Sequence, residues 1–307
     1  MTNFKKIGLT ALAGSLAAVG FAQAGDLSVS GTARMEYQST TDASGNSGDS
    51  FAQNTTVSFS GSGELDNGMT VSYLQALAGG SLTSQGVTLD MGDMGSVSMT
   101  NYNVAGIGTI QDMVPNGGEQ PWDDLGTHGT PQQGVASPHS GHRVGYKTTA
   151  GGAIISASMN YEFNSPTTSI AVQMPGLIDG LNVGAGIATD QRTAAIEDEI
   201  ETMYATYTMG ALSFGIQTTE VDATAANTDI TRDSMGVSFA VNENLSIGYG
   251  VSDTEFEAQT LDEENVGIGV SYTSGGMKLG IINNTKDNAG GSTGADEMTE
   301  FQLTFAF

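Results

Sequence analysis

The last ten residues, Met298-Thr299-Glu300-Phe301-Gln302-Leu303-Thr304-Phe305-Ala306-Phe307, alternate between apolar and polar side chains. Because residues two apart in a β-strand share one face, the phenylalanines and Leu303 line one side, while the intervening polar residues line the other. An apolar face opposite a polar one is typical of a strand in a transmembrane β-barrel, which has lipid outside and water inside. The C-terminal segment therefore predicts a lipid-contacting strand.

The N-terminal segment has the features of an export signal. Lys5 and Lys6 form a basic flank, residues 7–21 are largely apolar, and Ala22-Gln23-Ala24 is a small-residue cleavage site. A membrane-anchor helix is the weaker interpretation, since it needs about 20 apolar residues and this stretch is shorter. We predict a cleaved signal peptide at residues 1–24 and a single β-barrel domain at residues 25–307.

The composition excludes several classes of function. Of nine Lys and Arg residues two precede Ala24, so the mature chain has seven basic against 34 acidic residues, a net charge of −27. Nucleic acid binding requires a basic footprint, and here the basic residues are scattered singly. The sequence contains no cysteine, which excludes disulfides, thiol catalysis and zinc-thiolate sites.

Alternation of period two recurs along the whole mature chain, with no helical periodicity after the signal. With a weak segment near Ala171, the count is about sixteen strands. In each strand one set of alternate positions forms an apolar stripe, and no residue in these stripes is charged. Lipid would impose that absence, since a cation at the bilayer midplane costs about 2–4 kcal/mol. We therefore predict an all-β, closed, antiparallel transmembrane barrel, whose closure removes the strand edges.

The connections between these strands are expected to alternate in length. Short turns with Gly or Asn chemistry occur, for example, at residues 66–68 and 242–244, and they suit periplasmic hairpins. Longer polar connections, expected to be external, fall at residues 39–50, 79–86, 103–141, 163–166, 189–201, 219–231, 254–265 and 284–297. The third of these is by far the longest.

Aromatic residues are expected to form girdles at the two membrane interfaces. Tyr146, Tyr207 and Tyr272 fall near the predicted periplasmic strand ends, and Tyr37 and Tyr161 fall near the opposite ends.

The chain resembles the general-diffusion porins of Gram-negative outer membranes. The resemblance spans residues 26–307 and depends on the opening strand at residues 25–31, the G-D-x-G turn and strand at residues 92–99, and the terminal Phe307. Met94 stands where the family has an aromatic residue, and the P-E-F-G-G loop motif of enterobacterial members is missing. The resemblance implies a homotrimer of sixteen-stranded barrels, with the third loop folded into the lumen and Phe307 read by the outer-membrane insertion machinery.

The resemblance also implies a constriction between acidic residues of the third loop and basic residues of the facing wall. The candidates on the loop are Asp112, Glu119, Asp123 and Asp124, and those at polar strand positions are Arg34, Arg143, Lys147 and Lys278. Such charges select solutes by size and charge. The expected function is a passive outer-membrane channel for small hydrophilic solutes and ions, weakly cation-selective because of the acidic mouth. A second interpretation leaves the loop acids as solvated surface charges.

Other interpretations are weaker. His128, His139 and His142 lie in or beside the third loop, but one His-x-x-His spacing is a poor metal site, so we predict no bound metal and no cofactor. Acidic runs such as residues 197–199 and 262–264 suit loosely bound Ca²⁺ or divalent bridges to lipopolysaccharide phosphates. A substrate-preferring porin is the nearest alternative, followed by an outer-membrane hydrolase and a secreted acidic β-adhesin.

Overall fold

The computed structural model describes residues 27–307 except 121–124, 126–141, 163–164, 194–195 and 227. The predicted signal peptide therefore lies outside the described residues. No helix in the described part of the chain is both long and apolar enough to cross a membrane.

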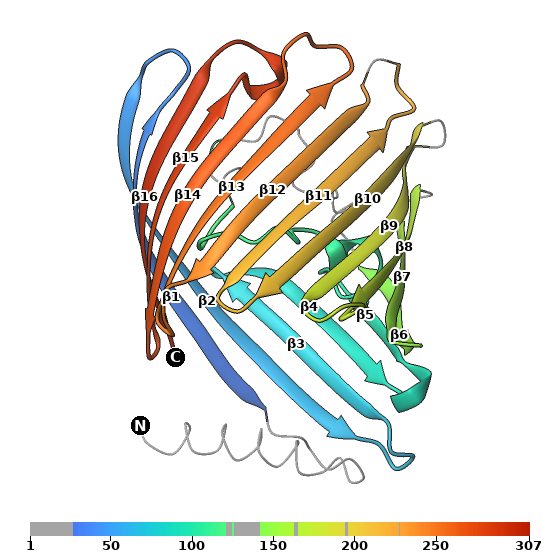
Figure 1. Cartoon of the computed structure of the whole chain (residues 1–307). Helices are drawn as coiled ribbons and strands as arrows, with labels where there is room; N and C mark the ends of the chain where they lie inside the picture. The colour runs from blue at the N-terminus through green and yellow to red at the C-terminus, as the bar shows by residue number, and fades with distance from the viewer. Residues whose placement is uncertain (1–26, 121–124, 126–141, 163–164, 194–195, 227) are drawn as a thin grey trace, which may run out of the picture.

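Sixteen antiparallel strands form one closed barrel, in which each strand pairs with its neighbours in sequence and β1 pairs with β16 (Figure 1). This confirms the predicted fold class and strand count. The strands are β1 (Ser28–Thr41), β2 (Ser47–Glu64), β3 (Thr70–Ala78), β4 (Ser81–Asp90), β5 (Ser96–Thr100), β6 (Arg143–Ala150), β7 (Ala153–Glu162), β8 (Ser165–Pro175), β9 (Leu181–Thr193), β10 (Ile196–Met209), β11 (Leu212–Asp222), β12 (Ile230–Ala240), β13 (Leu245–Phe256), β14 (Glu263–Ser274), β15 (Met277–Asp287) and β16 (Ala295–Ala306).

The two ends of the chain close the barrel. Thr32 of β1 pairs with Ala306 of β16, and the register continues to Thr41 opposite Glu297. Beyond it, Phe307 N donates to Gly31 O at 2.9 Å and Gly31 N donates to Phe307 O at 3.2 Å. The terminal aromatic residue thus takes part in the backbone pairing that leaves the sheet without an edge.

The strand parity separates lipid-facing from lumen-facing residues. In β11 and β12 the outward Ile216 and Met235 are 60% and 57% exposed, whereas their inward neighbours Gln217 and Ser234 are 3% and 6% exposed. Lipid surrounds the outward side chains in a membrane, so their exposure is that of a barrel without its bilayer.

Most external connections are shorter than expected because the strands continue beyond the apolar band. The prediction of a long connection at residues 79–86 is wrong, since β3 and β4 are joined by Gly79 and Gly80 alone. The strand extensions carry mostly polar side chains on both faces, so a search for alternating apolar residues does not detect them. The third external connection, which joins β5 to β6 at residues 101–142 and is called loop 3 here, remains the longest.

The aromatic residues of the predicted girdles lie on the outward face where their side chains are described. Tyr146 Oη donates to Met94 O at 2.7 Å, and the rings of Tyr207 and Phe214 lie 5.5 Å apart near the short-turn end. Tyr272 is also outward and exposed. Toward the other end the Tyr37 ring lies 5.2 Å from that of Phe51. The side chain of Tyr161 is outside the described part of the structure.

Candidate functional site

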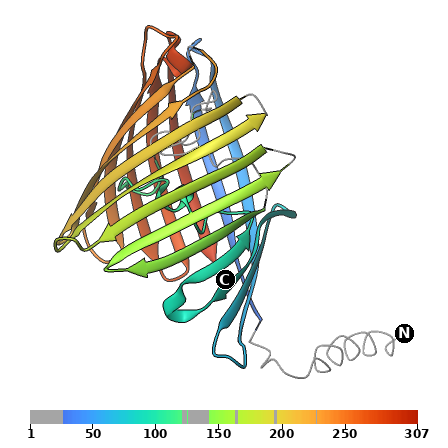
Figure 2. The ribbon, with the colours of Figure 1, turned by 90° about the vertical axis from the view of Figure 1, so that its right-hand side faces the viewer.

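Loop 3 runs inside the barrel, as both ribbon views show for its described residues (Figures 1 and 2). Ile107 N donates to Ser169 Oγ of β8 at 3.1 Å. Gln217 of β11 binds the loop twice, since its Nε2 donates to Ile110 O at 2.8 Å and its Oε1 accepts from Met113 N at 3.0 Å. Wall side chains therefore satisfy backbone groups that the loop would otherwise leave unpaired in the interior.

A small apolar cluster holds the beginning of the loop against the wall. Ile107 and Ile110, in the 3-10 turn η2 (Ile107–Ile110), are 1% and 0% exposed. They pack with inward residues of β8 to β11, namely Ala171, Ala188, Ile200, Tyr204 and Val221. Burying each isoleucine stabilises the docked loop by about 1.5–3 kcal/mol. These apolar residues break the inward polar pattern because the loop shields them from water.

The described end of the loop reaches the opposite side of the lumen. Gln302 Nε2 of β16 donates to Glu119 Oε2 at 2.5 Å and to Glu300 Oε2 at 2.8 Å. Asn284 Nδ2 of β15 donates to Gln120 O at 3.4 Å, and Lys286 Nζ donates to Leu125 O. Loop 3 is thus anchored at both ends of its described path.

A cavity of about 470 Å³ lies between this end of the loop and the wall formed by β1, β2, β15 and β16. Glu119 lines it from the loop, and Arg34 and Lys278 line it from the wall. Arg34 Nε also lies 2.7 Å from Glu36 Oε2. The structure therefore brings three of the predicted charged residues around one cavity.

The remaining predicted residues lie elsewhere or are not described. Arg143 is buried at the start of β6, where its Nη1 donates to Asn103 Oδ1. Lys147 has inward parity but pairs with Ser96 beside the short β4–β5 turn. Asp112 lies in loop 3, where it interacts electrostatically with Arg232. Asp123 and Asp124 lie outside the described residues.

A second charged group on the inner wall was missed by the sequence interpretation. Arg232 of β12 and Lys286 of β15 are 2% and 0% exposed, and Arg232 Nη2 lies 3.6 Å from Glu263 Oε1 of β14. Arg232 Nε donates to Thr254 Oγ1 at 2.8 Å. Both basic residues have the parity opposite to the apolar stripes of their strands, so extending that parity past the apolar positions would have found them.

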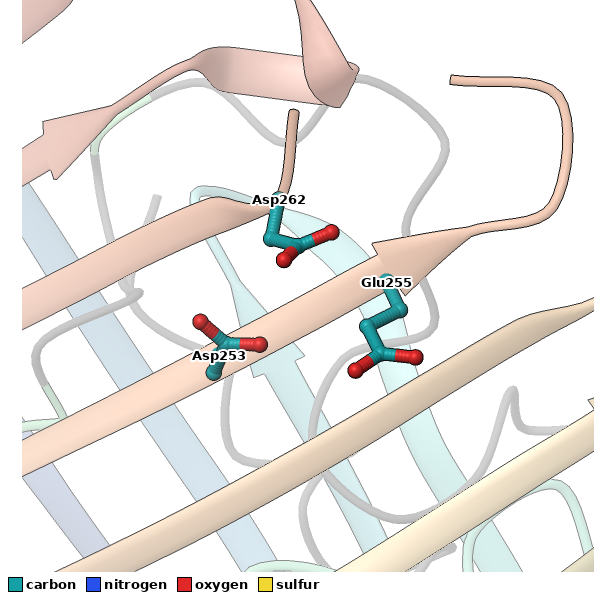
Figure 3. Close-up of side chains that lie close together, drawn as sticks. All are labelled: Asp253, Glu255 and Asp262. Atoms are coloured by element: carbon teal, nitrogen blue, oxygen red, sulfur yellow. The ribbon is translucent and has the colours of Figure 1, made fainter. Parts of the chain in front are cut away.

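Acidic residues collect on the outward face beyond the apolar band of β10 to β16. Asp253 and Glu255 of β13 and Asp262 of the following connection form one group, with carboxylate oxygens within 4.8 Å of one another (Figure 3). In register, Asp253 lies opposite Asp233 and Glu264. The other outward acids of these strands are Glu197, Glu199, Glu201, Glu220, Asp222, Asp287 and Glu297.

A closed sixteen-stranded barrel with an internal third loop is a porin architecture, and the family model described as Gram-negative porin matches residues 8–307. The chain belongs to the Gram-negative porin family. This porin is therefore an outer-membrane protein that forms a passive diffusion channel. No curated protein matches its sequence significantly.

Solved porin structures share the fold at low sequence identity. An anion-selective porin from Comamonas acidovorans is 14% identical with a TM-score of 0.73, over 92% of this chain and 99% of that one. Salmonella typhi OmpF is 11% identical with a TM-score of 0.70, over 92% and 98%. OmpT, an outer membrane protein of Vibrio cholerae, is 12% identical with a TM-score of 0.66, over 92% and 98%.

Proposed function

We propose that this porin passes small hydrophilic solutes and ions through a constriction between Glu119 and the wall that carries Arg34 and Lys278, with a weak preference for cations. The observation that supports this most is the cavity that these three residues share. Two further carboxylates, Glu36 and Glu300, have the same inward parity nearby, so acids slightly outnumber bases at this level. Opposed charges across a narrow passage orient water and disfavour apolar solutes.

The acidic residues of the outer rim support the same preference. They concentrate cations at the mouth, an effect that is screened beyond about 8 Å at physiological salt. Asp123 and Asp124 belong to this proposal as further loop acids at the constriction. The family and the fold are those of channels, and we infer no catalytic role.

We also propose a homotrimer in which the outer face of β1 to β8 contacts neighbouring copies. The outward acids support this, because in the described strand residues of β1 to β9 only Asp49 has outward parity, whereas β10 to β16 carry many. The acidic half would then face lipopolysaccharide, with Ca²⁺ loosely bound at groups such as Asp253, Glu255 and Asp262. Phe307 would be recognised by the insertion machinery.

Two measurements test the proposed function. Purified protein in a planar bilayer is expected to give discrete conductance steps, and proteoliposomes are expected to admit a small sugar. Preparations with heat-modifiable migration, the mark of a folded barrel, that show neither activity would refute the channel. Chemical crosslinking in the native membrane tests the trimer, which a product no larger than a monomer would contradict.

A further inference from the structure

Inward-facing glycines follow the path of loop 3 along the inner wall. Six of them lie against the stretch of loop 3 from Ala105 to Gly117, one on each of β6, β9, β11, β12, β13 and β14: Gly145, Gly186, Gly215, Gly236, Gly248 and Gly269. We call these six residues the glycine track. As the chain advances through loop 3 from Ala105 to Gly117, its contacts with the track move from β6 round to β14.

Each position of the track leaves little room for a side chain. A Cβ on Gly186 would lie 3.0 Å from both Ile107 Cγ1 and Ile110 Cδ1, and one on Gly215 would lie 2.7 Å from Pro115 Cδ. A Cβ on Gly236 would overlap Pro115 O, and one on Gly248 would overlap Gly117 N. The last two obstacles are backbone atoms, which cannot turn away as a side chain can.

Backbone conformation does not explain these glycines. None of the six is among the described residues with a positive φ. Glycine inside a strand is destabilising by roughly 0.5–1 kcal/mol relative to alanine, and it often marks close approach of another backbone. Space for loop 3 is therefore a physical reason for glycine at all six positions, and neighbouring wall atoms such as Ser98 Oγ and Thr206 Cγ2 add to the crowding at Gly145 and Gly215.

We propose that the glycine track sets the width of the pore by fixing how far loop 3 stands from the wall. This inference rests on the proposed channel function. Gly117, which contacts the track at β13 and β14, is followed directly by Gly118 and Glu119, which line the cavity beside Arg34. A side chain at Gly236 or Gly248 would overlap backbone atoms of Pro115 or Gly117, so it moves this part of the loop away from the wall and into the open lumen.

Gly280 of β15 provides a matched control. It also faces inward, but a Cβ there would lie 3.6 Å from Gln302 Cβ, an ordinary contact, and its near neighbours include no residue of loop 3. Alanine at this position changes the wall by the same methyl group without touching the loop.

The test compares single-channel conductance and sugar uptake for Gly236→Ala, Gly248→Ala and Gly280→Ala in the full protein. We expect the first two to conduct at about half the wild-type level, because a loop shift of roughly 1 Å narrows the passage that limits flow. Uptake of a large sugar should fall more than that of a small one. Gly280→Ala should match the wild type. Unchanged or increased conductance in the two track variants, with folded barrels, would overturn the proposal.

A rescue experiment keeps the proposal testable when Gly248→Ala does not assemble. Gly186→Ala should lower conductance, and adding Ile110→Val, which removes the Cδ1 atom that the new methyl group meets, should restore part of it. No loss in the single variant, or no recovery in the double variant, would count against the track. A wild type that does not conduct would instead refute the channel function itself.

Discussion

The two faces of the barrel wall differ more than any two segments of the chain. Along β10 to β16 the outward face carries apolar side chains and then acids, without a basic residue among the described positions. The inward face carries glycine, small polar residues and the described strand bases, namely Arg34, Arg143, Lys147, Arg232, Lys278 and Lys286. Because side chains alternate between the two faces along a strand, one residue contacts lipid and the next contacts the lumen, so neighbouring residues in the sequence have opposite requirements for polarity.

This difference shows that the charge of −27 does not describe the lumen. Acids beyond the apolar band face water or the outer leaflet, and the described outward positions of β10 to β16 hold no base that would neutralise them. Inside, Arg232 lies near Glu263 and Arg34 near Glu36, so basic residues offset part of the acidic charge of the passage. The net charge therefore describes the electrostatic potential at the mouth, and the local ion pairs describe the charge pattern at the constriction.

The largest expected effect comes from placing one cation on the wrong face. Ile281→Lys puts an ammonium group on the outward face of β15, where it costs about 2–4 kcal/mol near the bilayer midplane. We expect little assembled barrel in the outer membrane, measured as heat-modifiable protein. The control Ser72→Lys places the same group on the inward face of β3, between Ser62 and Thr88, and should assemble normally. Equal yields would contradict the assignment of the faces.

Removal of Phe307 should have the next largest effect. The deletion removes the two backbone hydrogen bonds to Gly31 that extend barrel closure, and the terminal aromatic residue proposed to be read during insertion. We expect precursor to accumulate in the periplasm. Phe301→Ala, a loss of another outward phenylalanine of β16, should assemble better, and normal surface yield of the deletion would refute the assembly role.

The smallest expected effect concerns an acid held by hydrogen-bond donors in the β1–β2 turn. A side-chain hydrogen bond from Asn46 is the main cause that lowers the pKa of Asp42, and the backbone amides of Asn46 and Ser44 add to it. The stabilisation is therefore present above the ordinary value of 3.8 and is lost as pH falls through the lowered pKa.

Asn46→Ala should raise the pKa of Asp42 toward that ordinary value. Carboxyl NMR of aspartate-labelled protein in detergent micelles measures the change. An unaltered titration curve would show that Asn46 does not hold the carboxylate.

The sequence was sufficient for the fold because lipid imposes a strict rule on alternate residues. The apolar stripe of the last strand, which includes Phe301, and the similar stripes of the other strands predicted the closed barrel and the strand number. They also predicted that Arg34 and Lys278 face inward. The strand extensions and the two-residue turn at Gly79 and Gly80 escaped that rule, since beyond the apolar band both faces are polar.

The path of loop 3 depends on contacts that no local pattern reveals. Burial of Ile107 and Ile110 against β8 to β11 joins segments far apart in sequence, and so does the hydrogen bond from Gln302 to Glu119. The inward glycines were visible as single residues, but their common contact with one loop follows only from three-dimensional arrangement.

Ion selectivity provides the most direct test of the constriction between Glu119 and the basic wall. We expect the reversal potential across a KCl gradient to show modest cation selectivity that weakens as salt rises, because salt screens the charges. Glu119→Gln should move the potential toward anions, whereas Asp42→Asn, which removes an equal charge from the rim, should move it much less. The potential measured for the wild type and Glu119→Gln decides the matter: a cation-selective wild type that loses this preference supports the proposed constriction, and an anion-selective wild type or an unchanged potential in the variant contradicts it.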